Sequence, residues 1–541
     1  MKSGNTNFSH MKSSHIKTFR DYLYQKQNTW LWILLFTAFS QGSMLLTQTV
    51  GVDTADAIRT RTANDIAAEL SVGRQGIVLV KYLTGHVLVN PLFAGVFTIL
   101  LLTCAAILWN YLFTSVSGID RGPAVYAFSL LLCSSPVLME VFYFKVQALE
   151  IAAGLCLVAV SLLCTFRFAT DDRRRSLWLS GAVLCMLIYM SIYQALVPLF
   201  VVGAQICFLL YFGLRPLAAQ ISRETSDAAP ASAQTSGIRD MLRFTSRFIL
   251  AFILGFGCNE LLSALFFSHG NAYIDQLFFW GSRPVTECLY HIGAYAFKTL
   301  LGFGIYFPPT YLILFFFALL LFLITPGIAS DNMSRLLVLD LLLLGLSPIY
   351  LPIAIGGRIP VRAQLTLPFT LAFFAWLFYA LINRYQTGRK ALSLGAALAL
   401  VLTCYLQLYT DLDLGYTDQM RYQTDALIAH DLINAIDLLQ EEHAYPVVFV
   451  GSYEQDLNPS CVIGEVTGHS MFAWDAAVPP EGVWSNKRCL AFLSCFGGNY
   501  PDADNASIEA AYASSGDIPC YPADGCVQLR GNLIIVKLSE P

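Results

Sequence analysis

The sequence predicts a polytopic α-helical membrane protein with a small C-terminal α/β domain. Hydrophobic residues make up 56% of the 541 residues and charged residues only 13%. A soluble protein of this length needs more charge to cover its surface. About eleven apolar runs recur, each near the roughly 20 residues that a helix needs to cross the hydrocarbon of a bilayer. The runs occupy residues 30–50, 92–116, 123–138, 148–168, 177–193, 195–214, 248–267, 301–325, 336–355, 365–382 and 391–409.

Composition divides the chain into three parts. Residues 1–29 form a polar, basic tail, residues 30–409 a multi-span membrane domain, and residues 410–541 a soluble domain. The first apolar run follows a long polar stretch and is long enough to span, so we expect an uncleaved first helix.

The soluble domain alternates helical and strand patterns. A 3.6-residue apolar period over residues 418–442 predicts a helix, and residues 446–451 are typical of a short buried strand. A second helix is expected around residues 509–514 and a closing strand at 532–538. This alternation predicts a small α/β fold.

The Lys and Arg residues predict the orientation. Most of them fall in the N-terminal tail and in alternating loops on its side, which the positive-inside rule assigns to the cytoplasm. Eleven spans then place the loop at residues 51–90 and the C-terminal domain outside the cytoplasm. No polybasic stretch with interleaved aromatics indicates nucleic-acid binding.

The first outer loop carries the most distinctive charges. Asp53 and Asp56 are three residues apart and share a face if the segment is helical. One of them, near an apolar surface, can act as a general base. Arg59 and Arg74 can hold a phosphate through their planar guanidinium groups. The alternative is a solvated loop whose charges pair with one another. Residues 76–90 predict an amphipathic helix at the membrane interface.

A second cluster follows a later span. Arg358 and Arg362 lie on the same outer side, at the depth where a lipid-linked phosphate sits, although anchoring to headgroups is the simpler alternative. Near other span ends, candidate substrate-binding residues are Glu140, Lys145, Tyr193 and Gln194.

Several passages together resemble the Gtr family of serotype-converting bacterial O-antigen glucosyltransferases, within the GT-C class of membrane glycosyltransferases. The similarity rests on their order and spacing over nearly the whole chain. The passages are the acidic cluster followed by Gly73-Arg-Gln-Gly76, the turn Ser191-Ile-Tyr-Gln194, Arg358-Ile-Pro-Val-Arg362, Val448-Phe-Val-Gly451, Gly468-His-Ser-Met-Phe-Ala-Trp-Asp475, and Ile518-Pro-Cys-Tyr-Pro522 to Ile534-Ile-Val-Lys537.

The resemblance implies a transferase at the outer face of the bacterial cytoplasmic membrane. Its donor would be a polyprenyl-phosphate sugar, its acceptor a surface glycan, and its partners a flippase and a polyprenyl-phosphate glucosyl synthase. Asp53 or Asp56 would act as the base or bind a divalent metal ion such as Mg²⁺ or Mn²⁺. Family members more often carry Trp where Gln75 stands, so a stacking role is not expected there.

Two other function classes share some of these features. A lipid-linked sugar flippase or transporter also has many spans, but here the charges gather in outer loops rather than along a path through the spans. A polysaccharide polymerase or ligase uses the same kind of donor. Release of polyprenyl phosphate without ATP separates a transferase from a flippase.

Overall fold

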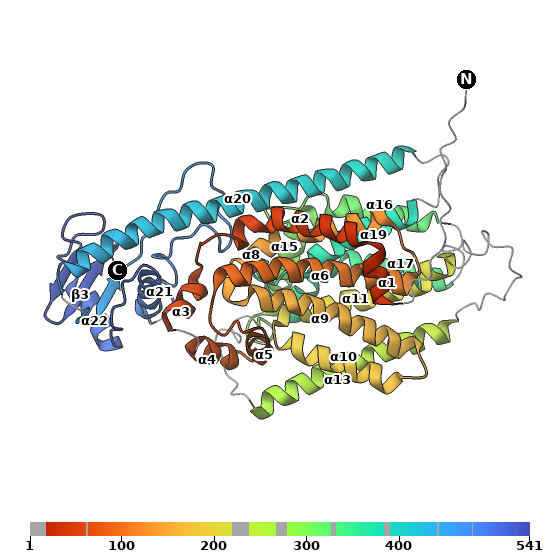
Figure 1. Ribbon diagram of the computed structural model, residues 1–541, viewed down its shortest axis with the longest axis horizontal. Helices are drawn as coiled ribbons and strands as arrows, with labels where there is room; N and C mark the ends of the chain where they lie inside the picture. The colour runs from red at the N-terminus through yellow and green to blue at the C-terminus, as the bar shows by residue number, and fades with distance from the viewer. Residues whose placement is uncertain are drawn as a thin grey trace, which may run out of the picture.

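The computed structural model describes most of the chain. It covers residues 18–60, 63–218, 237–266, 278–325, 332–382, 390–440, 443–478 and 480–540. Most of the predicted N-terminal tail therefore lies outside the described residues. The described part is elongated, with a helical bundle at one end and a small sheet-containing domain at the other (Figure 1).

Most helices of the bundle follow the apolar runs, and each predicted run contains helical residues. The helices are α1 Phe19–Gln25, α2 Gln27–Leu45, α6 Pro91–Ser117, α7 Gly122–Cys133, α8 Pro136–Phe142, α9 Lys145–Thr170, α10 Arg175–Met190, η1 Gln194–Leu196, α11 Val197–Leu209, η2 Leu210–Leu214, α13 Ile238–Phe266, α15 Val285–Leu301, α16 Tyr311–Leu323, α17 Asn332–Gly345, η3 Ser347–Ile349, α18 Tyr350–Ile355, η4 Val361–Ala363 and α19 Thr366–Ile382. Of these, α1, η4 and nearly all of α15 lie outside the runs.

The prediction of a polytopic α-helical membrane protein is confirmed by the lengths and the apolar composition of the helices. Among the described residues, five helices are long and apolar enough to span a bilayer, and counting two bent helix pairs as single spans brings the number to seven. Three more apolar helices have 10–17 residues. The total of about eleven crossings stays a prediction.

Helix α20, Lys390–Asp437, connects the two ends of the molecule. It has 48 residues and runs along the whole bundle into the C-terminal domain (Figure 1). The predicted domain boundary at residue 410 therefore falls inside a helix. The composition changes there from apolar to polar while the helical hydrogen bonding continues, so the sequence marks a change of environment and not an end of the helix.

The C-terminal domain surrounds a three-stranded sheet of order β1-β3-β2. Strands β1 and β3 are parallel, with Val447 opposite Ile534, and β2 is antiparallel to β3. Both strands expected from the sequence are present. The elements are β1 Val447–Val450, α21 Val483–Ser494, α22 Asn505–Ser514, β2 Val527–Arg530 and β3 Leu533–Lys537.

The loop at residues 51–90, predicted to be the first outer loop, folds into three short helices at the same end as this domain (Figure 1). They are α3 Val52–Thr60, α4 Ala63–Ser71 and α5 Gln75–Thr84. Helix α3 packs on α21, and its Val52 and Ala55 belong to the buried core that α20, β1 and α21 form. Burial of this apolar face holds the loop helix against the C-terminal domain.

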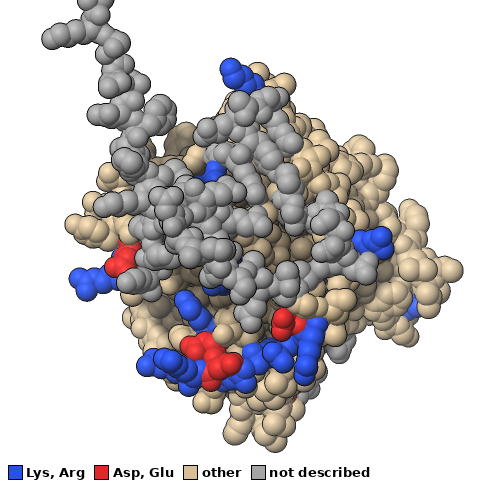
Figure 2. All heavy atoms as spheres, turned by 90° about the vertical axis from the view of Figure 1, so that its right-hand side faces the viewer, with Lys and Arg blue, Asp and Glu red and all other residues tan. Residues whose placement is uncertain are grey.

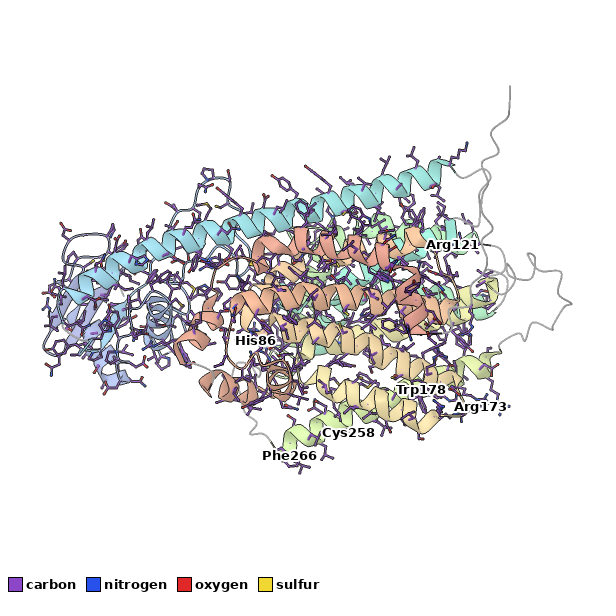
Figure 3. All side chains as sticks on the ribbon, in the orientation of Figure 1. His86, Arg121, Arg173, Trp178, Cys258 and Phe266 are labelled. Atoms are coloured by element: carbon purple, nitrogen blue, oxygen red, sulfur yellow. The ribbon has the colours of Figure 1, made fainter. Side chains whose placement is uncertain are left out.

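Helix α5 differs from the expected amphipathic arrangement. Lys81 and His86, which we expected at the membrane interface, are buried against Glu150 of α9. The His86 Nδ1 lies 2.9 Å and the Lys81 Nζ 3.8 Å from Glu150 Oε1, and Figure 3 labels His86 just after this helix. These polar groups are buried because they are paired. The outward face instead carries exposed Leu79 and Leu83.

Candidate active site

Helix α3 presents its two carboxylates to one arginine of the C-terminal domain. Arg488, on α21, forms an ion pair through Nη1 with Asp56, and the same nitrogen lies 3.6 Å from Asp53 Oδ1. Its Nε donates to Asp475 Oδ2 at 2.8 Å. The i, i+3 spacing predicted a shared face, and the structure confirms it.

The two aspartates occupy different environments. The Asp56 side chain is 19% exposed and is committed to Arg488, whereas the Asp53 side chain is 40% exposed. Burial raises the pKa of Asp56, an effect that the positive charges of Arg488 and Lys487 oppose. Asp53 is therefore the carboxylate that is more accessible to solvent.

Asp475 holds Arg488 from the other side. Its backbone φ is +58°, in the left-handed region that aspartate tolerates better than most residues. Such conformations persist only where the surrounding structure fixes them, and they concentrate at functional sites. This geometry aims the Asp475 carboxylate at the guanidinium and leaves Nη1 for the α3 acids.

The segment that leads into α3 is anchored by two buried cations. Lys145 Nζ donates to the carbonyl oxygens of Thr47 and Thr49, both at 2.9 Å. Arg421 of α20 donates to Val50 O at 3.1 Å. The predicted substrate-binding residue Lys145 thus fixes the start of the loop from inside the protein.

Gly51, the residue before α3, has no room for a side chain. A Cβ there would lie 2.8 Å from Tyr143 Cε1 and 3.0 Å from Tyr143 O. We expect Gly51→Ala to displace α3 and to lower kcat by roughly tenfold, because small misplacements of a reacting group are costly. Gly293→Ala, at a glycine with open space around it, is the control. Turnover assays that rank the two variants equally would contradict this role.

Arg59 contacts the C-terminal domain. Its Nη2 donates to Tyr500 O at 2.9 Å and lies 2.9 Å from Asp502 Oδ1. These contacts tie the end of α3 to the loop before α22. The sequence predicts Arg59 as a phosphate ligand, whereas in this structure its guanidinium docks the loop helix.

Three other predicted residues come together at the start of α5. Arg74 Nη1 lies 3.2 Å from Gln147 Oε1 and 3.4 Å from Glu69 Oε2. The guanidinium carbon stands 5.5 Å from the centre of the Tyr193 ring. Gln194 donates to Val72 O at 3.4 Å, so the turn before η1 closes against this loop. Residues far apart in the sequence thus form one cluster.

The second arginine cluster meets the C-terminal domain. Arg362 Nη1 lies 3.7 Å from Glu465 Oε1, and its guanidinium carbon is 5.2 Å from the centre of the Phe144 ring. Glu465 also accepts the backbone N–H of Val361 at 3.0 Å. Arg358 is exposed, in the turn after α18.

Glu140, a predicted substrate-binding residue, is fully buried on α8. Its carboxylate accepts hydrogen bonds from the Tyr306 hydroxyl and, at 2.9 Å, from the backbone N–H of Val466. It holds the loop that carries Glu465 against the bundle. In this arrangement it supports the site rather than lining it.

Several residues of the site have no signal in the sequence. Arg488 lies more than 400 positions from Asp56, and its own surroundings contain no known motif. Asp475 lies in a passage that resembles the family but has no charge pattern of its own. Buried Arg421 differs, because it pairs with Asp418 at 2.5 Å and Asp425 at 3.5 Å, an i−3, i+4 pattern along α20. That spacing is visible in the sequence and could have marked a buried ion cluster.

A cavity of about 450 Å³ lies at the opposite end of the bundle. It is lined by Arg167, Arg173 and Arg215 together with Asp171 and Asp172. Figure 2 shows lysine and arginine side chains spread over this end, and Figure 3 labels Arg173 and Arg121 there. The cavity is far from the α3 carboxylates and belongs to the end with the positive charge.

The residues around α3 do not suit a divalent metal ion. Asp53, Asp56 and Asp475 all face the guanidinium of Arg488, which already supplies positive charge at their centre. Within the described ranges, no cluster of three or more His, Cys, Asp or Glu side chains has metal-binding geometry.

The fold and the site define a multi-helix membrane protein. Its candidate site places carboxylates and arginines beside the C-terminal domain. The family model described as glucosyl transferase GtrII matches residues 42–379. The chain belongs to this family and is a membrane glycosyltransferase, which confirms the resemblance to the Gtr-type enzymes. The match includes all ten site residues predicted from the sequence, whereas Arg488 and Asp475 lie beyond it. No curated protein matches the chain.

Proposed function

We propose that the protein transfers a sugar, most simply glucose, from a polyprenyl-phosphate sugar to a surface polysaccharide such as O-antigen. The observation that carries the proposal is the 40% exposed Asp53 carboxylate on α3, which lies beside the partly buried ion pair of Asp56 with Arg488. Family membership supplies the class of reaction.

In this proposal Asp53 is the general base. It takes the proton of the acceptor hydroxyl as the hydroxyl oxygen bonds to the anomeric carbon of the sugar. The bond from that carbon to the phosphate oxygen breaks, and polyprenyl phosphate leaves with the bonding electrons. Because the donor is already activated, the step needs no ATP.

Arg74, Arg358 and Arg362 are the proposed phosphate ligands. Arg74 lies 3.4 Å from Glu69 and Arg362 lies 3.7 Å from Glu465, and the planar guanidinium of each matches the oxygens of a phosphate. Arg358 is exposed and reaches solvent. Positive charge at this place stabilises the phosphate as it leaves.

The proposed orientation puts α3, α5 and the C-terminal domain outside the cytoplasmic membrane. These elements share one end of the molecule, and the arginine-rich loops occupy the other (Figures 1 and 2). The positive-inside rule assigns the arginine-rich end to the cytoplasm. The donor must then be made inside and flipped, which requires a polyprenyl-phosphate sugar synthase and a flippase as partners.

The test is a transfer assay with the purified full-length protein in proteoliposomes. We expect polyprenyl-phosphate glucose and an acceptor glycan to give glucosylated glycan and polyprenyl phosphate in equal amounts, without ATP. Movement of the donor between leaflets without cleavage would identify a flippase. Chain extension by preformed repeat units would identify a polymerase. Either result overturns the proposal.

A further inference from the structure

A groove separates the start of α5 from α10 and the end of α13. It has a volume of about 290 Å³, and most of its lining is apolar. The apolar side chains come from all three helices: Leu79, Leu187, Ile188, Leu262 and Phe266. Figure 3 labels Phe266 at the tip of α13, at the end of the bundle that carries the outer-loop helices.

The groove opens onto an apolar surface of the protein. Leu262 is 39% exposed and Phe266 70%, and Leu79 also reaches the outside. Large exposed apolar side chains on a membrane protein face lipid, so a chain can enter this groove sideways from the bilayer. At its floor the Gly76 N–H donates to Ser191 O at 3.0 Å, which fixes α5 directly on the end of α10.

One end of the groove is polar. Gln75 and Asn259 line it, and their side-chain oxygens are buried without hydrogen-bond partners in the described part of the chain. An amide can present either its oxygen or its NH₂ group at such a place. Arg74, the residue before Gln75, lies just outside the lining, with its guanidinium against Gln147 and Glu69 and its Nε buried and unpaired within the described residues. These groups suit the phosphate or a hydroxyl of a lipid headgroup.

We infer that this groove seats the first isoprenoid units of the lipid-linked donor and delivers its phosphate to Arg74. The inference rests on the proposed function. A volume of this size holds a segment of a polyprenyl chain, and the remainder lies along the exposed apolar faces of α5 and α13. An isoprenoid joined to a phosphate matches an apolar groove with amide side chains at one end, where Gln75 is the neighbour of Arg74 in the chain.

Two donors test the inference in nanodiscs with the full-length enzyme: long-chain polyprenyl-phosphate glucose and a water-soluble short-chain analogue. We expect Leu262→Trp, and independently Leu79→Trp, to raise KM for the long-chain donor at least about tenfold, because the indole fills the groove and displaces several buried methylenes of the lipid. Both variants should leave kcat and the short-chain KM unchanged. The control is Leu265→Trp on the same helix, at a 65% exposed residue outside the groove.

A direct binding measurement covers the case in which no turnover is seen. A diazirine-tailed polyprenyl phosphate should crosslink to α5, α10 or α13, and excess undecaprenyl phosphate, but not phospholipid, should compete. The crosslink should weaken in Leu262→Trp and persist in Leu265→Trp. Equal long-chain KM values in wild type and both groove variants, or competition by phospholipid alone, would overturn the inference. Wild-type crosslinking without transfer would leave the groove standing and refute the proposed function.

Discussion

Replacing Asp53 by Asn is expected to lower kcat by about 10²–10⁴-fold, the range that a positioned general base contributes. The amide keeps the size of the side chain but cannot accept the acceptor proton. KM for the donor should change little, because Asp53 does not contact the donor phosphate in the proposed scheme. Steady-state kinetics in nanodiscs, with expression and thermal unfolding as folding controls, measure this effect.

Asp56→Asn is the matched comparison. Asp56 is the more buried acid and already pairs with Arg488, so we expect a smaller loss of kcat together with a lower melting temperature. A fully active Asp53→Asn variant beside an inactive, stably folded Asp56→Asn variant would reverse the assignment. Normal activity in both would remove α3 from the mechanism.

Replacing Arg488 by Met is expected to have the second large effect. The change removes the guanidinium that Asp53, Asp56 and Asp475 share, and leaves Asp56 only the weaker influence of Lys487 and Arg59. Removal of one member of a buried ion pair costs about 3–5 kcal/mol, and partial exposure of these side chains brings the cost to the lower end of that range. The contact between α3 and α21 should loosen, and kcat should fall with it.

The double variant Arg488→Met, Asp56→Asn separates charge from packing. Removing one of the facing carboxylates relieves the repulsion, so the double variant should be more stable than Arg488→Met alone. Thermal unfolding and turnover measure both quantities. Additive losses would show that Arg488 acts through its aliphatic packing and would contradict the role of its charge in holding the carboxylates.

The sequence allowed the membrane class, the shared face of Asp53 and Asp56, and the strands β1 and β3 to be predicted. These features depend on local patterns, since apolar run length and i, i+3 spacing are read directly from neighbouring residues. The continuation of α20 from the membrane domain into the C-terminal domain was harder to predict. Helical hydrogen bonds continue across residue 410 although the side chains change from apolar to polar, so the change in composition does not coincide with the end of a helix.

The site could not be predicted in full, because its side chains pair with residues that are far away in the sequence. Nothing near Asp56 indicates that its partner is Arg488, and nothing near Lys81 indicates that Glu150 draws it inward. The choice between Asp53 and Asp56 could not be made from spacing, because it depends on which carboxylate the C-terminal domain covers. Arg59 and Arg74 looked equivalent in the sequence, but Arg59 contacts Tyr500 and Asp502 of the C-terminal domain whereas Arg74 contacts Gln147 and Glu69.

A cryo-EM structure of the Asp53→Asn enzyme with polyprenyl-phosphate glucose and acceptor glycan would show the proposed reaction geometry itself. We expect the introduced amide side chain at position 53 to lie within about 2.6–3.2 Å of the acceptor hydroxyl. The donor phosphate should lie on Arg74 or the Arg358–Arg362 segment. A donor headgroup at the arginine-rich end of the bundle, or an acceptor hydroxyl facing a different carboxylate, would contradict the proposed mechanism.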